Sequence, residues 1–374
     1  MSTKSIIGEN RSERLRNIAF ALIVGNLCYT MIPIPVIAWR FALISIALFC
    51  ILRDRQTFYE KNVLLFLGMI MLYFFIAFFY SNPTTTSIGD TFSAFASFYT
   101  FSYFNRKHVI TEKFISVASI CLIVGCYVYY SSYEDMLIQL LSQGEDDVTV
   151  NASSVFMFLI PFLFYVKNRW LAFAELCICV FFIVSSVKRG NIIAVAIPVF
   201  LFLKYRLIEF KTNKMKTIIL LCLVICAGFY LGNMLQNNDY FMFRYEETLD
   251  GDSSDRDIIY AQAYHVFLKS SSFNMIFGNG YDATFNIIHV PAHCDWLELL
   301  VDYGIIGVLI YLSLFVNFFR KCMYTVRLID KYVIGACLSM WSFKSIYSMA
   351  YLETWMMIMM IAFGIALTNT ERYK

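Results

Sequence analysis

Pro291-Ala292-His293-Cys294-Asp295-Trp296-Leu297-Glu298 closes the long polar interruption of an otherwise apolar chain, residues 236–298, and runs directly into the apolar segment 299–319. The interruption carries three basic side chains against ten acidic ones. Loops poor in Lys and Arg normally lie on the side of a membrane away from the cytoplasm, although long loops follow this rule less strictly. The sequence therefore predicts an extracytoplasmic loop, and we expect any chemistry to take place there.

The composition excludes the soluble globular classes. Of the 374 residues, 59% are hydrophobic and 15% are charged, and the mean hydropathy is +0.63. A helix needs about 20 mostly apolar residues to cross the hydrocarbon, so the length allows roughly a dozen spans. The net charge of +3 does not indicate a nucleic-acid partner, because the basic residues sit in short loops between apolar segments.

The charge pattern supports a count of twelve spans. Basic residues fall in alternate loops, at 53–61, 106–107, 167–169, 204–216 and 320–331, whereas residues 33–35, 81–90 and 132–151 contain no Lys or Arg. With both termini in the cytoplasm, this arrangement satisfies the positive-inside rule almost everywhere. The candidate spans are 17–32, 36–52, 63–80, 91–104, 109–131, 152–166, 170–187, 191–204, 217–235, 299–319, 332–349 and 352–368.

We therefore expect an all-α polytopic membrane protein with about 12 transmembrane helices. Residues 1–374 would form a single integral membrane domain, and the loop 236–298 would lie between the ninth and tenth helices. The first span follows a basic segment without a small-residue cleavage site, so we interpret it as an uncleaved helix. Only Cys294 among the eleven cysteines would lie on the far side, which excludes a disulfide framework.

Lys188 and Arg189 break the charge pattern, because they lie between the seventh and eighth spans on the side that otherwise avoids basic residues. One interpretation is that the two side chains extend to the lipid headgroups. The other is that they bind an anion together with the basic residues of the long loop, Arg244, Arg256 and Lys269. We favour an anion site, because it accounts for all five cations on a face that is otherwise acidic.

Arg256 and His293 are the strongest candidates within the loop. Residues 253–257 are typical of a helix start, so Arg256 would lie in a first turn and could hold a phosphate together with free backbone N–H groups. Local pairing with Asp255 or Asp257 is the alternative. Pro291 suits the first turn of a helix, which would place His293 in that turn and favour a neutral imidazole able to act as a general base. The alternative for His293 is a helix cap.

The remaining polar groups are assigned less specific roles. Asp295, Glu298 and Asp302 fall on one helix face, where they could orient His293, contact an acceptor or form a solvated stripe. His289 and His293 have a spacing compatible with zinc, but Pro291 interrupts the helical register between them, so we predict no metal site. The turn Gly278-Asn279-Gly280 is a weak phosphate-loop candidate, because no strand or long helix frames it.

The order and spacing of these motifs resemble the O-antigen polymerase and O-antigen ligase superfamily of bacterial inner-membrane proteins, in the Wzy-type branch. The resemblance covers residues 180–315. It is carried by the Lys188-Arg189-Gly190 turn, by Arg256 and a Gly-x-Gly turn in the long loop, by the segment Ala292–Leu300 and by Tyr303-Gly304-Ile305-Ile306-Gly307. Cys294 departs from the family pattern, which has Asn at this position.

The resemblance implies a GT-C-like, metal-independent glycosyltransferase without a cofactor, active at the periplasmic face of the inner membrane. It would polymerise undecaprenyl-diphosphate-linked oligosaccharide repeat units into O-antigen or capsular polysaccharide. Residues matching Arg189 and Arg256 would hold the diphosphate, and the match to His293 would activate the acceptor hydroxyl. Lys188 and Arg244 are further diphosphate candidates, and Asp295 and Glu298 are supporting or acceptor-binding candidates. A chain-length regulator and a flippase are the expected protein partners.

Two other functions remain open. Within the same superfamily, the chain could be an O-antigen ligase that transfers finished glycan to lipid A-core. From a different class, it could be a polysaccharide transporter or flippase. Transporters usually show related halves and charges at the membrane midplane, whereas this sequence shows no internal repeat and few intramembrane charges, Arg40 and Lys344 among them.

Overall fold

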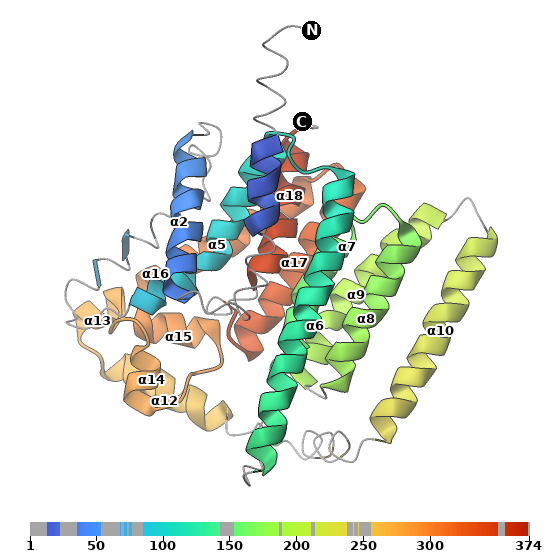
Figure 1. Cartoon of the computed structure of the whole chain (residues 1–374). Coiled ribbons are helices and arrows are strands. Elements are labelled where there is room, and N and C mark those ends of the chain that lie inside the picture. The colour runs from blue at the N-terminus through green and yellow to red at the C-terminus, as the bar shows by residue number, and fades with distance from the viewer. Residues whose placement is uncertain are drawn as a thin grey trace, which may run out of the picture. The chain divides into compact units, whose positions relative to one another are not determined.

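The regular elements of the part of the chain that the structure describes are α-helices (Figure 1). The structure is a computed structural model that describes residues 13–22, 36–53, 68, 71–72, 75–76, 85–142, 153–186, 189–210, 214–237, 242, 246, 256–350 and 356–372. Within these ranges, three helices are long and apolar enough to cross a membrane, over Glu112–Ser131, Gly190–Glu209 and Gly304–Tyr324. The prediction of a helical membrane protein is confirmed at this level, and the count of twelve spans stays a prediction.

The chain divides into two compact units, and each is described here by itself. The first unit comprises residues 1–33 and 108–252, and its helices are α6 (Glu112–Ser142), α7 (Ser154–Leu163), α8 (Arg169–Ser185), α9 (Arg189–Phe210) and α10 (Lys214–Gln236). The second comprises residues 34–107 and 253–374. Its helices are α2 (Val36–Arg53), α5 (Thr85–Arg106), α12 (Arg256–Lys269), α13 (Ser272–Phe277), α14 (Ala283–Ile288), α15 (Asp295–Asp302), α16 (Gly304–Tyr324), α17 (Leu328–Tyr347) and α18 (Met356–Arg372).

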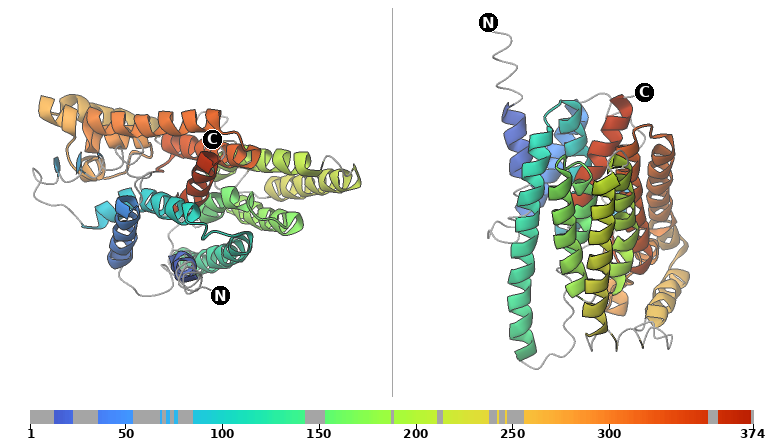
Figure 2. Two further views of the ribbon diagram at one scale, coloured as in Figure 1. Left: turned by 90° about the horizontal axis from the view of Figure 1, so that it is seen from above. Right: turned by 90° about the vertical axis from the view of Figure 1, so that its right-hand side faces the viewer.

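Helix α7 is the buried centre of the first unit. All ten of its residues are buried, and it packs against α6, α8 and α9. Helices α8, α9 and α10 run side by side (Figure 2). A helix that is apolar on every side needs neighbours all around it, and polar contacts at both ends of α7 fix its position among these neighbours.

A chain of hydrogen bonds joins three helix ends near the start of α7. The amide of Asn191 donates to Ser153 Oγ at 3.2 Å, Ser153 donates to Ser186 Oγ at 2.7 Å, and Ser186 donates to the Ile183 carbonyl at 2.7 Å. Each hydroxyl donates one proton, so these hydrogen bonds run in one direction and end on the Ile183 carbonyl in the last turn of α8. They hold Ser186 and Asn191, which flank residues 187–190, at the start of α7.

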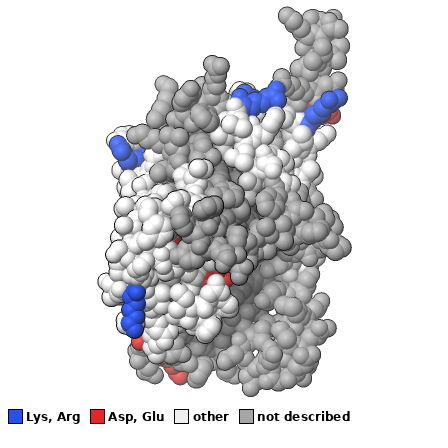
Figure 3. Space-filling view, turned by 90° about the vertical axis from the view of Figure 1, so that its left-hand side faces the viewer, with Lys and Arg blue, Asp and Glu red and all other residues white. Residues whose placement is uncertain are grey.

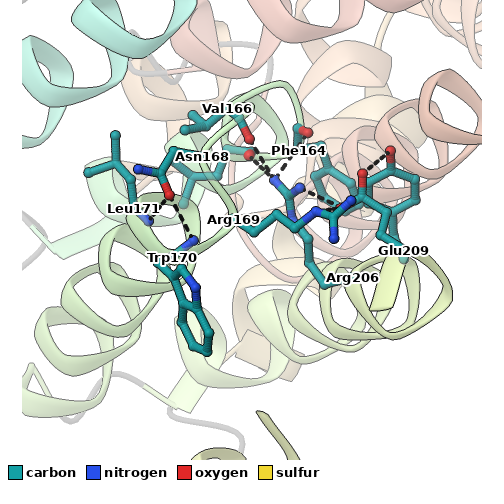
Figure 4. A network of polar contacts seen from close by, with 10 residues as sticks. Phe164, Val166, Asn168, Arg169, Trp170, Leu171, Arg206 and Glu209 are labelled. Atoms are coloured by element: carbon teal, nitrogen blue, oxygen red, sulfur yellow. Dashed lines mark hydrogen bonds and ion pairs between the residues drawn. The ribbon is translucent and has the colours of Figure 1, made fainter. Parts of the chain in front are cut away.

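Arg206 of α9 holds the opposite end of α7 (Figure 4). Its Nη2 donates to the carbonyls of Leu163, Phe164 and Val166 at 3.1, 3.3 and 3.0 Å. These are the carbonyls at a helix C-terminus that have no partner within the helix. The Nη1 of Arg206 also pairs with Glu209 Oε2 at 2.7 Å, so this buried cation is compensated by charge and by dipoles.

In the second unit, α5 and α18 pack closely along their length. A Cβ atom added at Gly364 would lie 2.6 Å from the Phe98 carbonyl, so the absence of a side chain allows the backbones to approach. The buried amide of Asn105 donates to the Ile365 carbonyl, Thr368 Oγ1 and Asn369 Oδ1 at 3.2, 2.7 and 2.9 Å. Predicted as a span of 91–104, this helix extends over 22 residues, Thr85–Arg106.

The long polar loop is mostly helical from Arg256 onward, and it contains α12, α13, α14 and α15 (Figure 1). The prediction of one continuous helix through 299–319 is wrong, because α15 ends at Asp302 and α16 begins at Gly304. The turn at Gly278 causes this break. Asn279 N–H donates to the Val301 carbonyl at 2.8 Å and Gly280 N–H donates to the Asp302 carbonyl at 3.1 Å.

Two glycines allow the close backbone approach between residues 276–280 and residues 301–304, which is called the glycine crossing below. Gly278 and Gly304 have φ angles of 93° and 65°, in the left-handed region that side chains other than glycine rarely adopt. A Cβ atom at Gly304 would lie 2.5 Å from the Ile276 carbonyl, and one at Gly278 would collide with the Asp302 carbonyl. The glycine turn is therefore a structural element that caps α15.

Charged side chains are sparse on the molecular face shown in Figure 3. There, Lys and Arg lie near the upper and lower edges of the described surface, and most of the described surface between them is uncharged. Large hydrophobic side chains are also exposed on the candidate spans, for example Phe200 at 62% and Phe319 at 60%. Exposed apolar helix faces with charges at their ends are typical of helices in a bilayer.

Candidate functional site

His293 lies just outside the helix in which it was expected. Helix α15 begins at Asp295 rather than near Pro291, because Cys294 is extended with φ −151° and forms its N-cap. His293 itself has a φ of 52°, which is uncommon for a residue with a side chain and is found disproportionately at functional sites. His293 is half-buried and lies two residues before the helix, so the predicted influence of the helix dipole on its imidazole loses its basis.

Tyr260 of α12 connects His293 to the end of α17. Its hydroxyl lies 3.5 Å from the His293 carbonyl and 3.3 Å from the Ile346 carbonyl, and both oxygens share the proton. Burial raises the pKa of Tyr260 above its ordinary value, so the hydroxyl stays protonated and able to donate. Tyr260 was not predicted to have a role beside Arg256 or His293. Its position four residues after Arg256, on the same helix face, was the signal for a shared role.

Arg256 occupies the first turn of α12, as predicted, and its main contact lies elsewhere in the chain. Its Nη1 donates to the Tyr347 carbonyl at 2.8 Å, at the C-terminal end of α17. That carbonyl end carries partial negative charge, which favours a cation. A guanidinium has five N–H donors, and among the described residues the bond to Tyr347 uses one of them, which leaves donors for an anion. The structure thus brings Arg256 and the His293 backbone to the same helix end, through Tyr347 and Tyr260.

The acidic face of α15 is buried. Asp295, Glu298 and Asp302 are each 0% exposed, so the solvated stripe considered from the sequence is wrong. Each carboxylate accepts backbone N–H groups from a different segment. Ala350 N–H donates to Asp295 at 2.7 Å, Ala292 N–H donates to Glu298 at 2.8 Å, and the N–H groups of Asp282 and Thr284 donate to Asp302 at 2.9 and 3.2 Å.

Asp295 has a hydrogen-bond donor on each of its carboxylate oxygens. The Tyr311 hydroxyl donates to Asp295 Oδ2 at 2.6 Å, and Trp341 Nε1 in turn donates to the Tyr311 oxygen at 2.7 Å. Tyr311 and Trp341 did not emerge from the sequence, because both lie within apolar segments where aromatic residues are common. Through them, Asp295 links the start of α15 to α16 and α17, which fits a supporting role for this carboxylate.

Glu298 is less well satisfied than Asp295. Its Oε2 accepts the Ala292 N–H, whereas Oε1 is buried without a hydrogen-bond partner among the described residues. The pKa of Glu298 is raised to about 7, mainly by burial; the Ala292 N–H opposes this shift, and the nearby Asp282 adds to it. A carboxyl group with this pKa exists in both protonation states near neutral pH.

The other predicted anion ligands belong to the first unit or fall outside the described residues. Arg189 is the first residue of α9 in the first unit, where its backbone is described. Lys188 and Arg244 lie outside the described residues. Within the described ranges, no group of three His, Cys, Asp or Glu side chains is placed to hold a metal ion. The described part of the candidate site therefore consists of Arg256, Tyr260, His293 and the carboxylates of α15.

Comparison with known proteins does not place the chain in a family. No family model matches it, and no curated protein does. The candidate function consequently depends on the residues themselves and on their arrangement.

Proposed function

We propose that the chain is a membrane glycosyltransferase that polymerises undecaprenyl-diphosphate-linked repeat units into O-antigen or capsular polysaccharide. The reaction would take place at the periplasmic face of the bacterial inner membrane. The observation that carries this proposal is the convergence of Arg256 and the His293 segment on the end of α17, through Tyr347 and Tyr260. A cation and an imidazole held by one framework suit a substrate that is both a diphosphate and a hydroxyl acceptor.

The proposed reaction is a displacement at a sugar carbon. The acceptor hydroxyl oxygen attacks the anomeric carbon of the donor glycan while the bond from that carbon to the diphosphate oxygen breaks. His293 accepts the hydroxyl proton, and the leaving undecaprenyl diphosphate retains the bonding electron pair. Arg256 and Arg189 would stabilise the negative charge that develops on the diphosphate. All parts of this reaction use side chains, without a metal or an organic cofactor.

A reconstituted polymerisation assay tests the proposal. The purified full-length chain in bilayer discs would receive lipid-diphosphate-linked repeat units, and the products would be separated by length. We expect Arg256→Ala to lower the rate by about 10²-fold, the loss typical when a group that stabilises a leaving anion is removed. Arg320→Ala is the matched control, because Arg320 is an exposed arginine near the end of α16 and belongs to no part of the predicted anion site.

His293 requires its own comparison. We expect His293→Ala to lower the rate by roughly 10²- to 10⁴-fold, as for loss of a general base. His265→Ala, which changes an exposed His on α12, should leave the rate nearly unchanged. Full polymerisation by the His293→Ala protein would contradict the assignment.

Cells lacking the protein separate the alternative functions. Lipid A-core that carries a single repeat unit would support a polymerase. Lipid A-core without glycan, together with accumulated lipid-linked polymer, would indicate the ligase. If repeat units instead stay on the cytoplasmic side, the chain is a transporter. Normal export with unpolymerised units in cells carrying His293→Ala would argue against transport.

A further inference from the structure

Helix α13 turns apolar side chains outward and a polar side chain inward. Phe273 and Ile276 of this helix are 41% and 44% exposed. The amide of Asn274, by contrast, donates to Asn279 Oδ1 at 2.9 Å, and the amide of Asn279 donates to the Val301 carbonyl at 3.1 Å. A surface helix that faces water has the opposite arrangement, with its polar side chains outside. The outer side of α13 therefore suits apolar surroundings.

The glycine crossing places α13 at one end of a helix that can cross a membrane. Helix α13 packs against α16, and a Cβ atom added at Gly304, the first residue of α16, would lie 2.5 Å from the Ile276 carbonyl. Helix α16 is long and apolar enough to be a span and has 21 residues. At 1.5 Å per residue it is about 32 Å long, close to the hydrocarbon thickness of about 30 Å. A span of this length puts Gly304, and with it Ile276, at a boundary of the hydrocarbon.

The exposed apolar surface of α16 begins at the same place. Its exposed apolar side chains recur every three or four residues, so they form one stripe along the helix. The members of the stripe are Ile305, Leu309, Leu312, Val316 and Phe319. Ile305 directly follows Gly304, so the stripe starts next to the backbone of Ile276. A bilayer that surrounds α16 would therefore also reach the outer side of α13.

A second apolar segment contacts α13 through aromatic rings. Phe75 belongs to the expected span 63–80, and the centre of its ring lies 5.1 Å from that of Phe277 and 6.4 Å from that of Phe273. Phe75 is itself 40% exposed. Aromatic side chains are common where a membrane protein meets the membrane–water boundary. This contact supports the same placement of α13 as the glycine crossing does.

We propose that α13 lies in the boundary between lipid headgroups and hydrocarbon, with Phe273 and Ile276 inserted among phospholipid acyl chains. Helices of this kind bury their apolar face about 5–10 Å into that boundary. The partner of the exposed face is thus the bilayer itself. The polar loop is anchored to the lipid at α13, and the glycine crossing transmits this anchor to the ends of α15 and α16.

Helix α12 then lies across the membrane surface. Its first residue, Arg256, donates to the carbonyl of Tyr347 at the end of α17, and its last residue lies three positions before α13 begins. Gln262, His265 and Lys269 are exposed and share one face of α12, and this face is directed to water. The placement of the two helices holds whichever substrate the site takes, so it does not depend on the proposed function.

Photo-cross-linking of the full-length chain tests this placement. p-Benzoylphenylalanine, which on irradiation bonds to nearby C–H groups, replaces one residue at a time in protein held in discs of phosphatidylethanolamine and phosphatidylglycerol. We expect the probe at Phe273 and at Ile276 to give chains heavier by the mass of one phospholipid. The probe at Leu309, in the stripe of α16, is the positive control. The probe at His265, on the polar face of α12, should give no lipid adduct.

Two sites on α13 keep the test decisive if one replacement disturbs the fold, which the elution volume of each variant in detergent reveals. Lipid adducts at Leu309 but none at Phe273 or Ile276 would show that α13 faces water, and this would overturn the proposal. Cross-linked dimers at Phe273 and Ile276 without lipid adducts would identify a second copy of the chain as the partner, which would overturn it equally. Loss of polymerisation activity affects neither result, so the proposed function and the lipid contact fail separately.

Discussion

The hydroxyl of Tyr260 donates to the carbonyl of His293 across 3.5 Å, and the two residues are separated by 33 positions in the sequence. A helix of the polar loop thus holds the backbone of the residue on which the proposed chemistry depends. Because the same hydroxyl also contacts Ile346 at 3.3 Å, the position of His293 depends on α12 and α17 together.

Removing this hydroxyl tests the relationship directly. Tyr260→Phe leaves the ring in place and removes the donor, so we expect the polymerisation rate to fall by roughly tenfold, equivalent to the net free energy of one hydrogen bond, about 1.4 kcal/mol. Tyr264→Phe, on an exposed residue of the same helix, should have no effect. Equal rates for the two variants would show that the Tyr260 hydroxyl does not position His293.

The glycine crossing should be sensitive to one added methyl group. Gly304→Ala forces a side chain into the left-handed region and against the Ile276 carbonyl, so we expect a loss of about 2 kcal/mol or more in the free energy of unfolding. Gly232→Ala, in α10 with open space around its Cβ position, should be neutral or slightly stabilising. Thermal unfolding in detergent measures the stability of both variants. An unchanged unfolding temperature for Gly304→Ala would contradict the close backbone approach at Gly304.

The Asp295 network predicts a cost for losing its central hydroxyl. Tyr311→Phe leaves both Asp295 Oδ2 and Trp341 Nε1 without the partner that each has now, and a buried unsatisfied group costs about 1–3 kcal/mol. We expect about 3 kcal/mol of destabilisation by denaturant titration. Tyr324→Phe provides the comparison, because Tyr324 is exposed on the same helix. A loss below about 0.5 kcal/mol would exclude the network as a stabilising element.

Stability should fall with pH in a window set by Glu298. Its pKa is raised from 4.5 to about 7 in the fold, so the folded state binds a proton that the unfolded chain releases. The contribution is complete below pH 4.5 and is lost as pH rises through 7, with an upper limit of ~3 kcal/mol. Unfolding temperatures of wild type and Glu298→Gln, measured from pH 5 to pH 9, should differ in slope over this range. Parallel curves would rule out Glu298 as the titrating group.

Much of the helical framework was predictable from hydropathy and charge. The span expected over 36–52 appears as α2 (Val36–Arg53), and that expected over 217–235 appears as α10 (Lys214–Gln236). These boundaries depend on local apolar runs and on the basic residues that end them. The start of α12 at Arg256 also followed from a local pattern.

The errors lie where distant segments decide the structure. The break between Asp302 and Gly304 depends on a turn more than 20 residues earlier in the sequence, and the burial of Glu298 depends on the N–H of Ala292 folding back onto α15. The start of α15 at Asp295 follows from the extended backbone of Cys294 and the positive φ of His293, which no local sequence pattern indicates. Aromatic hydrogen-bond partners such as Tyr311 cannot be recognised within apolar runs of the sequence, because only the packing of the helices shows what their polar atoms contact.

The contacts of Gly280 and Asp282 with Asp302 also have an evolutionary consequence. They close residues 280–302 into a ring whose two ends meet at one place, so changes of length within the ring need not move the helices outside it. Lengthening a surface segment between fixed ends has only a small entropic cost. Residues 285–291, most of which are exposed, are therefore the part of the ring whose length can change while α13 and α16 keep the same junction.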